Sequence, residues 1–212
     1  MRNIIIVCDD LFGMEIYSIL ARANDWNRER GKDPDYQILG YICDSERPFG
    51  DLSSRLERLG SIQGWKPVGD EAYVLGIALP ERKREVVFAL KAAGCIFCTV
   101  RAPWMLALNI EVGEGSVAAA YSIKDGMKVG SYVTLVESML TSKSVQDYST
   151  VLRFSNITGN VGEGSFVGNH VYSHLGKTIG DHCYVEDGSI IVKNVKSGTR
   201  VSGVPARKIK AN

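Results

Sequence analysis

The feature that most constrains this chain is a six-residue repeat between Val161 and Lys196. Branched apolar residues recur at every sixth position, with one serine among them. These positions are Val161, Val167, Ser173, Ile179, Val185 and Ile191. A period of six is neither helical nor the two-residue alternation of an ordinary strand, and it is typical of hexapeptide β-helices. Each hexapeptide supplies a short strand and a turn, so this half of the chain is predicted to be a parallel β-helix.

Composition and charge narrow the classes of function. The 212 residues carry a formal net charge of +1, so the chain has no basic footprint for nucleic acid. No apolar run approaches the roughly 18 residues of a membrane span. The N-terminus leads straight into an apolar strand without a signal-peptide cleavage pattern. We therefore expect a cytoplasmic protein with neither a nucleic-acid partner nor a membrane span.

The five cysteines are expected to be core residues rather than ligands. Cys95 and Cys98 have the C-x-x-C spacing, but no second pair exists to complete a zinc site. A redox pair would need a helix N-terminus after the first cysteine, whereas residues 95–100 have the pattern of a buried strand. We therefore predict no metal, and the free cysteines suit a cytoplasmic compartment.

Residues 1–104 alternate between strand and helix patterns. Strands are expected at residues 3–7, 36–42, 72–78 and 95–100, and helices at 11–23 and 80–94. Pro80 opens the second helix and Gly94 closes it. Residues 45–69 are expected to be a loop with a helical turn at 52–59. This alternation predicts a small Rossmann-like α/β domain with a parallel sheet, followed by the β-helix as a second domain at residues 105–212.

Ligands of parallel sheets bind at the carboxyl ends of the strands. The first such loop contains Asp9 and Asp10 but only one glycine, Gly13, so it is not a dinucleotide fingerprint. Carboxylates at a helix N-terminus suit the helix dipole as capping groups, and they would repel a diphosphate. Asp44 ends the second strand, where it either begins a loop or accepts hydrogen bonds from a ribose or base.

The hexapeptide pattern is irregular in two places. One start comes two residues early, at Val161, so the turn at 158–160 is shortened. Ser173 is a polar start, and Lys177 is a cation where a small inward residue belongs. Departures from a local rule cluster at functional or strained sites, so residues 173–177 are the first candidate site.

The order of these parts resembles the sugar O-acyltransferases of the sialic acid (NeuD) type and the related nucleotide-sugar N-acetyltransferases. An α/β domain precedes the hexapeptides and the closing motif Gly203-Val-Pro-Ala-Arg-Lys-Ile209, so the resemblance covers nearly the whole chain. It implies a left-handed β-helix, a homotrimer and acetyl-CoA bound between neighbouring β-helices. The implied substrate is a sugar or nucleotide sugar on the α/β domain, in surface-polysaccharide synthesis.

The resemblance also implies site residues. The residues expected near the nucleotide end of CoA are Gly203, Pro205, Arg207 and Lys208. The residues expected near the sugar nucleotide are Asp10, Phe12, Gly13 and Asp44, which fall at the family's glycine-rich loop and acidic strand end. Those two sets define the expected donor and acceptor ends of the site.

One departure from the family concerns the chemistry. The family carries a catalytic histidine followed by an acid in a turn that aligns with residues 158–160, where this chain has Gly159 and Asn160 and two residues fewer. A sugar hydroxyl or ammonium must lose a proton as it attacks the thioester. Imidazole is the usual base near pH 7, and neither glycine nor asparagine replaces it.

Three histidines are available as a substitute. His170 and His182 each come three residues after a start and are expected on the outer surface. His174 lies in the irregular repeat beside Gly176, whose backbone N–H could face a developing oxyanion. His174 and Gly176 are therefore the predicted catalytic residues, the first as the base.

Two further interpretations remain open. The same stretch resembles the γ-class carbonic anhydrases, with His174 on one zinc-ligand position. However, Asn169 stands at a second position, with His170 one residue out of register, and no third ligand is present, whereas zinc catalysis normally keeps three. Alternatively, the protein is a binding or scaffold protein that kept the fold and lost the family histidine.

Overall fold

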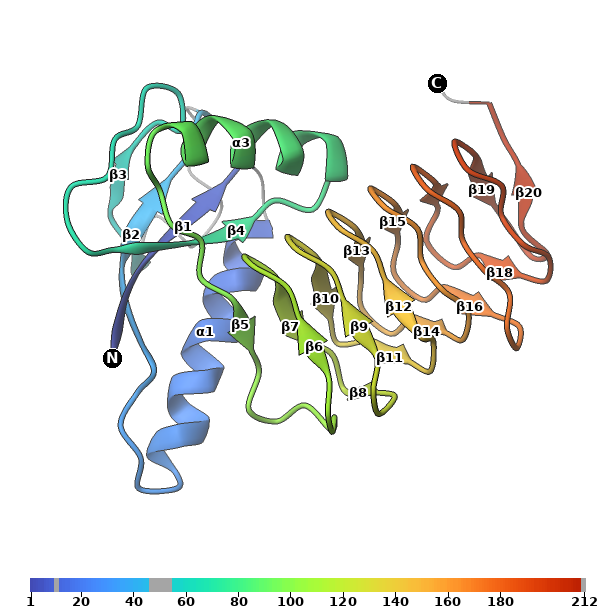
Figure 1. Ribbon diagram of the computed structural model, residues 1–212, viewed down its shortest axis with the longest axis horizontal. Helices are drawn as coiled ribbons and strands as arrows, with labels where there is room; N and C mark the ends of the chain where they lie inside the picture. The colour runs from blue at the N-terminus through green and yellow to red at the C-terminus, as the bar shows by residue number, and fades with distance from the viewer. Residues whose placement is uncertain (10–11, 46–54, 211–212) are drawn as a thin grey trace.

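Among the described residues, the N-terminal part of the computed structural model forms a four-stranded parallel sheet between two helices (Figure 1). The structure describes residues 1–9, 12–45 and 55–210. The sheet order is β3-β2-β1-β4. The strands are β1 (Arg2–Cys8), β2 (Tyr36–Ile42), β3 (Arg58–Gly60) and β4 (Ala72–Gly76), and the helices are α1 (Phe12–Arg28) and α3 (Pro80–Ala92). The predicted α/β unit is therefore present, and α1 is one turn longer than expected.

Alternation along β1 explains why the helices lie on opposite faces. Ile4 and Ile6 pack with the apolar side of α1, whereas Ile5 and Val7 pack with α3. Successive side chains of a strand point to opposite faces, so a continuous apolar run is the pattern of a strand that is covered on both sides.

Two strand expectations for this unit were wrong. Residues 95–100 do not form a strand of the parallel sheet, because only Phe97 forms a single bridge, to Tyr73. The fourth strand is β3, from the stretch expected to be a loop and helical turn; residues 46–54 of that stretch lie outside the described residues. β3 has only three residues, too few to show a periodic pattern.

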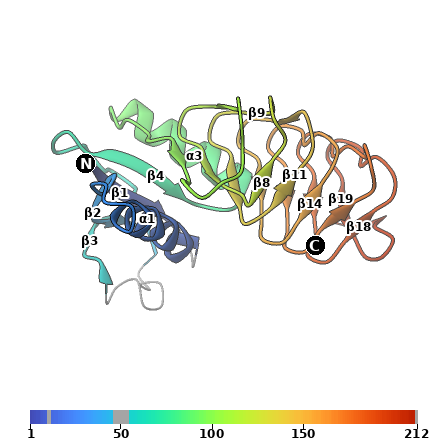
Figure 2. The ribbon, with the colours of Figure 1, turned by 90° about the horizontal axis from the view of Figure 1, so that it is seen from below.

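The rest of the chain winds into a parallel β-helix with three faces (Figure 1, Figure 2). Sheet 1 contains β5 (Val100–Arg101), β7 (Val117–Ala119), β10 (Thr134–Val136), β13 (Thr150–Val151), β15 (Phe166–Val167), β17 (Tyr184–Val185), β19 (Arg200–Ser202) and the antiparallel β20 (Arg207–Lys208). Sheet 2 contains β8 (Ser122–Ile123), β11 (Met139–Leu140), β14 (Asn156–Ile157), β16 (Tyr172–Ser173) and β18 (Ile190–Ile191). Sheet 3 contains β6 (Glu111–Val112), β9 (Lys128–Val129) and β12 (Ser144–Val145), and single bridges extend it through Val161, Ile179 and Val195.

The hexapeptide starts fill the interior of the β-helix, as predicted. All six are at most 2% exposed, including Ser173 at 0%. Ser173 is tolerated inside because its hydroxyl oxygen accepts the backbone N–H of Thr158 at 2.8 Å. The expectation for Lys177 was wrong, because this residue lies in a corner between sheets and is only half-buried.

The α/β unit packs directly on the first coils of the β-helix. Val117, Ala119 and Val136 of sheet 1 belong to the same buried cluster as β1 and α1. Figure 2 shows this unit at the N-terminal end of the β-helix, leaving the later coils uncovered by it. In the described part of the chain, no helix combines the length and apolar character that a membrane crossing requires.

Candidate functional site

The irregular repeat forms an extended corner between sheets 2 and 3, comprising residues 174–178. It joins Ser173 of sheet 2 to Ile179 of sheet 3. In the coils on either side, the corresponding corners are residues 158–160 and 192–194, which are two residues shorter. The longer corner projects from the surface, with Leu175 87% exposed. The second irregularity in the sequence is therefore a local protrusion rather than a break in the coil.

The short turn at 158–160 is closed by the extended corner that lies on it. A Cβ atom added at Gly159 would lie 2.0 Å from the carbonyl oxygen of Lys177 and 2.3 Å from its carbonyl carbon. Those are backbone atoms, so no side-chain rotation would relieve the clash. The Asn160 side chain is also occupied, since Oδ1 accepts the backbone N–H groups of Lys143 and Ser144 at 3.0 and 3.2 Å. This turn therefore has room for neither a histidine at Gly159 nor a free side chain at Asn160.

Thr158 binds the extended corner to the short turn. Its hydroxyl donates to the carbonyl oxygen of His174 at 2.8 Å and accepts the backbone N–H of Gly176 at 3.1 Å. The expectation that the Gly176 N–H faces an oxyanion is not met, because this donor is already used by Thr158. Gly176 has φ +71°, and its glycine identity is explained by this left-handed conformation.

His174 is the exposed histidine of this corner, with its ring edge-on to that of Tyr172 at a centroid distance of 5.8 Å. Its backbone is hydrogen-bonded to the coils on both sides, to Thr158 and to Ile191. It lies one coil above the turn in which the resemblance places a histidine, a displacement of about 4.8 Å along the β-helix. The side chain is therefore open to a ligand on the outside of the coil.

The three histidines occupy three different corners of the coil. His170 lies between sheets 1 and 2 and stacks on Phe154, at 5.0 Å between ring centroids. His182 lies between sheets 3 and 1, over Gly164. Both are exposed, as predicted. Within one chain these histidines do not meet, and the described residues contain no group of three potential metal ligands.

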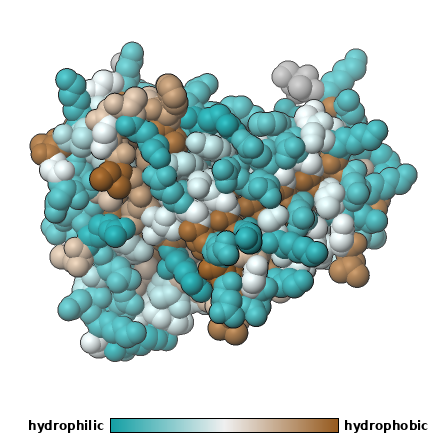
Figure 3. Space-filling view, viewed as in Figure 1, coloured by the Kyte–Doolittle hydropathy of each residue, from teal (hydrophilic) through white to brown (hydrophobic). Residues whose placement is uncertain are grey.

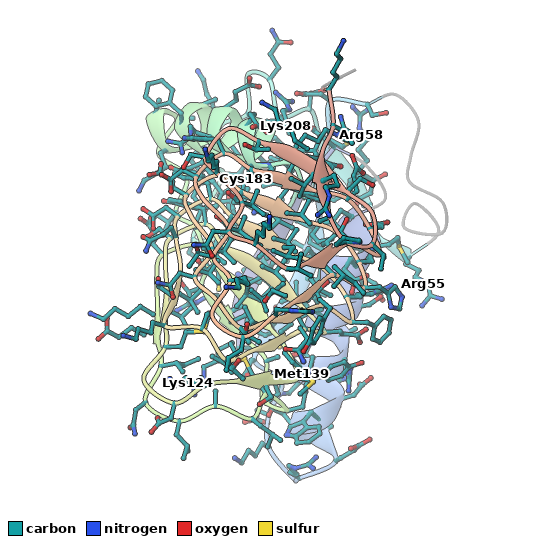
Figure 4. The ribbon with its side chains drawn as sticks, turned by 90° about the vertical axis from the view of Figure 1, so that its right-hand side faces the viewer. Arg55, Arg58, Lys124, Met139, Cys183 and Lys208 are labelled. Atoms are coloured by element: carbon teal, nitrogen blue, oxygen red, sulfur yellow. The ribbon has the colours of Figure 1, made fainter. Side chains whose placement is uncertain are left out.

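The closing motif forms a cationic hairpin on the last coil. β19 and β20 pair antiparallel, and Gly203, with φ +98°, lies in the turn between them together with Pro205. Arg207 and Lys208 are exposed on β20. Figure 4, which looks along the β-helix from this end, labels Lys208 on the outer side of the coils. The structure therefore brings the four predicted donor-side residues together.

Two cavities flank Lys208. One, of about 530 Å³, is lined by Arg207 and by Lys193 and Lys196 of the preceding turn. The other, of about 850 Å³, is lined by Tyr184, Arg200 and Lys210 among others. Clustered lysine and arginine side chains are the groups that bind phosphates through charge-assisted hydrogen bonds. This end of the β-helix could therefore hold a ligand with several phosphates.

The acceptor-side residues that the structure describes lie in the α/β unit, where β1 and β2 end and α1 begins. Arg82 of α3 forms ion pairs with both Asp9 and Asp44, the latter at 2.9 Å. The second oxygen of Asp44 accepts the backbone N–H of Gln63 at 2.9 Å. Because these carboxylates favour the charged guanidinium, the pKa of Arg82 is raised further above its ordinary value, mainly by Asp9. A cavity of about 400 Å³ adjoins Asp44 and Arg82, with Trp65 in its wall.

The other predicted acceptor residues have different local roles. Asp10 lies outside the described residues. Phe12 is half-buried and packs against the α1 core. Gly13 is buried, and its Cα lies 3.0 Å from where a Cβ would stand on Gly76, so it allows α1 to approach β4 closely. Asp44 therefore has the best position of the four for contact with a ligand.

Sequence reasoning missed two functional candidates on α3, Arg82 and Lys83. A cation in the first turn of a helix carries no periodic signal, and its partners are about 40 to 75 residues away in sequence. Lys83 is 0% exposed and reaches the outer face of sheet 1. The alternation of apolar and polar residues in α3 predicted its inward face through Val86, Val87 and Leu90, but not this buried lysine.

No protein-family model and no curated protein sequence matches the chain. Among solved structures, WeeI from Acinetobacter baumannii is 20% identical with a TM-score of 0.77, over 99% of this chain and 100% of that one. A histidine-to-alanine mutant of GDP-perosamine N-acetyl transferase from Caulobacter crescentus, in complex with CoA and GDP-perosamine, is 14% identical with a TM-score of 0.73, over 100% and 98%. The acetyltransferase domain of PglB from Neisseria gonorrhoeae is 16% identical with a TM-score of 0.67, over 99% and 100%.

These likenesses extend over both parts of the chain in the same order. They confirm the fold expected from the sequence, a small parallel sheet followed by a left-handed parallel β-helix. At these identities the likenesses show the fold.

Proposed function

We propose that this protein transfers an acetyl group from acetyl-CoA to a sugar or nucleotide sugar in the synthesis of a surface polysaccharide or another glycan. The observation that carries this proposal is the whole-chain likeness to acetyltransferases, one of them crystallised with CoA and GDP-perosamine. The acceptor group favoured by that likeness is an amine, because GDP-perosamine N-acetyl transferase acts on an amino group. No resident metal or cofactor is needed for this reaction.

The donor is proposed to bind with its nucleotide end at the cationic hairpin. CoA carries a diphosphate and a further phosphate, which suit Arg207 and Lys208 and the neighbouring Lys193 and Lys196. Gly203 and Pro205 shape the turn that presents these cations. The thioester would then extend along the outside of the coils toward the extended corner, which lies in the preceding coil.

His174 is proposed to be the general base. The acceptor amine or hydroxyl attacks the thioester carbonyl, and its proton passes to the imidazole. The carbon–sulfur bond then breaks, and the imidazolium returns that proton to the leaving sulfur, so that CoA leaves as the thiol. Support comes from the exposure of His174 and from its position one coil above the closed turn at 158–160. The Gly176 N–H does not serve as the oxyanion donor in this proposal, because it already donates to the Thr158 hydroxyl.

The acceptor is proposed to bind at the carboxyl ends of β1 and β2, beside Asp44. Each carboxylate oxygen has two acceptor sites, so Asp44 can still accept from a hydroxyl or base N–H while it pairs with Arg82 and Gln63. Asp10, Phe12 and Gly13 are proposed to lie near the sugar nucleotide because of the resemblance in sequence alone. The acidic character of the loop favours the nucleoside or sugar part over the diphosphate at this point.

A homotrimer in the cytoplasm is the proposed working form. On the outside of sheet 2, Leu106, Met139 and Tyr172 lie on one ladder, where they alternate with Ser122 and Asn156, and are 74%, 48% and 44% exposed. Figure 3 also shows a hydrophobic band running along the β-helix between polar side chains. Exposed apolar surface of this kind is typical of contact sites between proteins. Light scattering should therefore give a molecular mass equal to that of three chains.

All five cysteines are free and buried, which suits a reducing compartment such as the cytoplasm.

The proposal is tested by titration calorimetry with acetyl-CoA, followed by a thiol-release assay with UDP-, GDP- and CMP-linked amino sugars. We expect acetyl-CoA to bind and one acceptor class to release CoA. The double substitution of Arg207 and Lys208 by Met should weaken acetyl-CoA binding, whereas Lys124→Met, an exposed lysine of a distant corner, should not. Binding of neither acetyl-CoA nor any nucleotide sugar would contradict the proposal.

The second candidate function is a scaffold that has lost the chemistry. The closed turn at Gly159 and the occupied N–H of Gly176 favour it. It predicts that acetyl-CoA produces no thiol with any acceptor, even where it binds. The same thiol-release assay therefore separates the two functions.

A further inference from the structure

Two consecutive cations in the first turns of α3 contact different parts of the molecule. Arg82 bridges Asp9 and Asp44 at the proposed acceptor end. Lys83 is fully buried and contacts the β-helix. Neighbouring residues of a helix point about 100° apart, so a single helical turn can serve both directions. α3 therefore connects the acceptor end to the β-helix through adjacent residues.

The contacts of Lys83 attach α3 to one rung of sheet 1. Its Nζ donates to the hydroxyl oxygens of Thr134 and Thr150, at 3.0 and 2.9 Å, and lies 3.4 Å from the carbonyl oxygen of Ser149. Thr134 and Thr150 face each other across β10 and β13. The Thr150 hydroxyl donates in turn to the carbonyl oxygen of Ala78, just before α3, at 2.7 Å. The rung thus holds the start of α3 at two points.

Burying the Lys83 side chain costs free energy of folding. This cost indicates that the lysine positions α3 rather than stabilising the fold. Its three acceptors are neutral, and burial lowers its pKa to about 7. A methionine of similar length would fill the same space without the desolvation penalty. Buried polar groups that cost stability can instead define a unique arrangement of the elements they join.

We propose that Lys83 is a positioning residue for the acceptor: by attaching α3 to the Thr134–Thr150 rung, it holds Arg82 between Asp9 and Asp44. This inference rests on the proposed function for its kinetic consequence. The positional part is independent of the reaction, because it concerns only how α3 is placed.

The kinetic test compares Lys83→Met with Lys91→Met. Lys91 is the matched control, since it also joins α3 to the β-helix, through Glu114 at 2.9 Å, but it is exposed on the surface. Lys83→Met should raise the KM for the nucleotide-sugar acceptor at least ~10-fold, because misplacement by ~1 Å costs up to ~100-fold. The KM for acetyl-CoA should stay within about two-fold of the wild-type value. A general loss of stability would not change the KM for one substrate and spare the KM for the other.

A double-substitution cycle tests the route through Arg82. Arg82→Met should reproduce the acceptor effect, and adding Lys83→Met to it should change the KM little further, because both substitutions act on one contact. If Lys83→Met folds poorly, Thr150→Val removes one of the acceptors and should give a smaller effect of the same kind. An unchanged acceptor KM in Lys83→Met, or effects that simply add, would overturn the inference while leaving the proposed function intact.

A structural readout separates the two proposals if the wild-type protein shows no turnover. The backbone N–H of Gln63 donates to Asp44, so its hydrogen exchange reports how firmly Asp44 is held. Exchange should be faster in Lys83→Met and Arg82→Met than in wild type and Lys91→Met. Equal exchange in all four proteins would overturn the positioning role, whatever the activity.

Discussion

The closed turn below the extended corner makes a sharp prediction for Gly159→Ala. The added Cβ would lie 2.0 Å from the carbonyl oxygen of Lys177, and this glycine has no left-handed backbone conformation to add strain of its own. Extra methylene groups in tight packing cost about 1–3 kcal/mol, and more where neighbours cannot move. Because the neighbours are backbone atoms of the next coil, we expect a loss of at least ~3 kcal/mol in the free energy of unfolding.

Gly176→Ala is the matched control in the adjoining corner. No atom lies within 4 Å of the position that its Cβ would take, but its φ is +71°. An alanine there should lower the free energy of unfolding only by the cost of the left-handed backbone conformation, about 1–2 kcal/mol. Urea unfolding followed by far-ultraviolet circular dichroism, at one protein concentration, should therefore rank the three proteins as wild type, Gly176→Ala and then Gly159→Ala. A Gly159→Ala variant as stable as Gly176→Ala would refute the claim that this turn excludes a side chain.

Three further outcomes follow from the same structure. Burial lowers the pKa of Lys83 to about 7, so between pH 7 and pH 10.5 the unfolded chain binds more protons than the folded one and stability rises with pH. The free energy of unfolding should gain about 2 kcal/mol from pH 7 to 9, and Lys83→Met should abolish that gain. His174→Ala should lower kcat by about 10²–10⁴-fold in the thiol-release assay, and His170→Ala, at an exposed histidine of another corner, should leave it unchanged. The double Met substitution of Arg207 and Lys208 should raise the Kd for acetyl-CoA at least ~10-fold, with a weaker dependence of binding on salt.

The repeat was predictable because its cause is local. A residue that points into a narrow three-sided coil must be apolar or small, and this requirement returns every six residues, as Val161 and Val167 show. The same logic located the extended corner, since Ser173 and Lys177 interrupt the pattern. What the pattern could not supply was the direction of Lys177, because a corner two residues longer shifts it from the interior to the surface.

The contacts between the two parts of the chain were beyond sequence reasoning. The Arg82 contacts with Asp9 and Asp44 depend on how α3 is placed over the ends of β1 and β2. The Lys83 contacts depend on a rung of sheet 1 that is 51 and 67 residues away in sequence. The hydrogen bond from the Gly176 N–H to the Thr158 hydroxyl likewise joins two neighbouring coils. Pairings of this kind follow from the packed structure and leave no spacing in the sequence.

The measurement that tests the central claim most directly is release of free CoA from acetyl-CoA by the wild-type protein with a panel of nucleotide-linked amino sugars. Mass spectrometry of the product should accompany it. The account predicts thiol release that depends on one acceptor, with a product heavier by one acetyl group, and loss of this activity in His174→Ala. Absence of acetylated product with every acceptor, from protein that is folded and binds acetyl-CoA, would contradict it and leave the scaffold function.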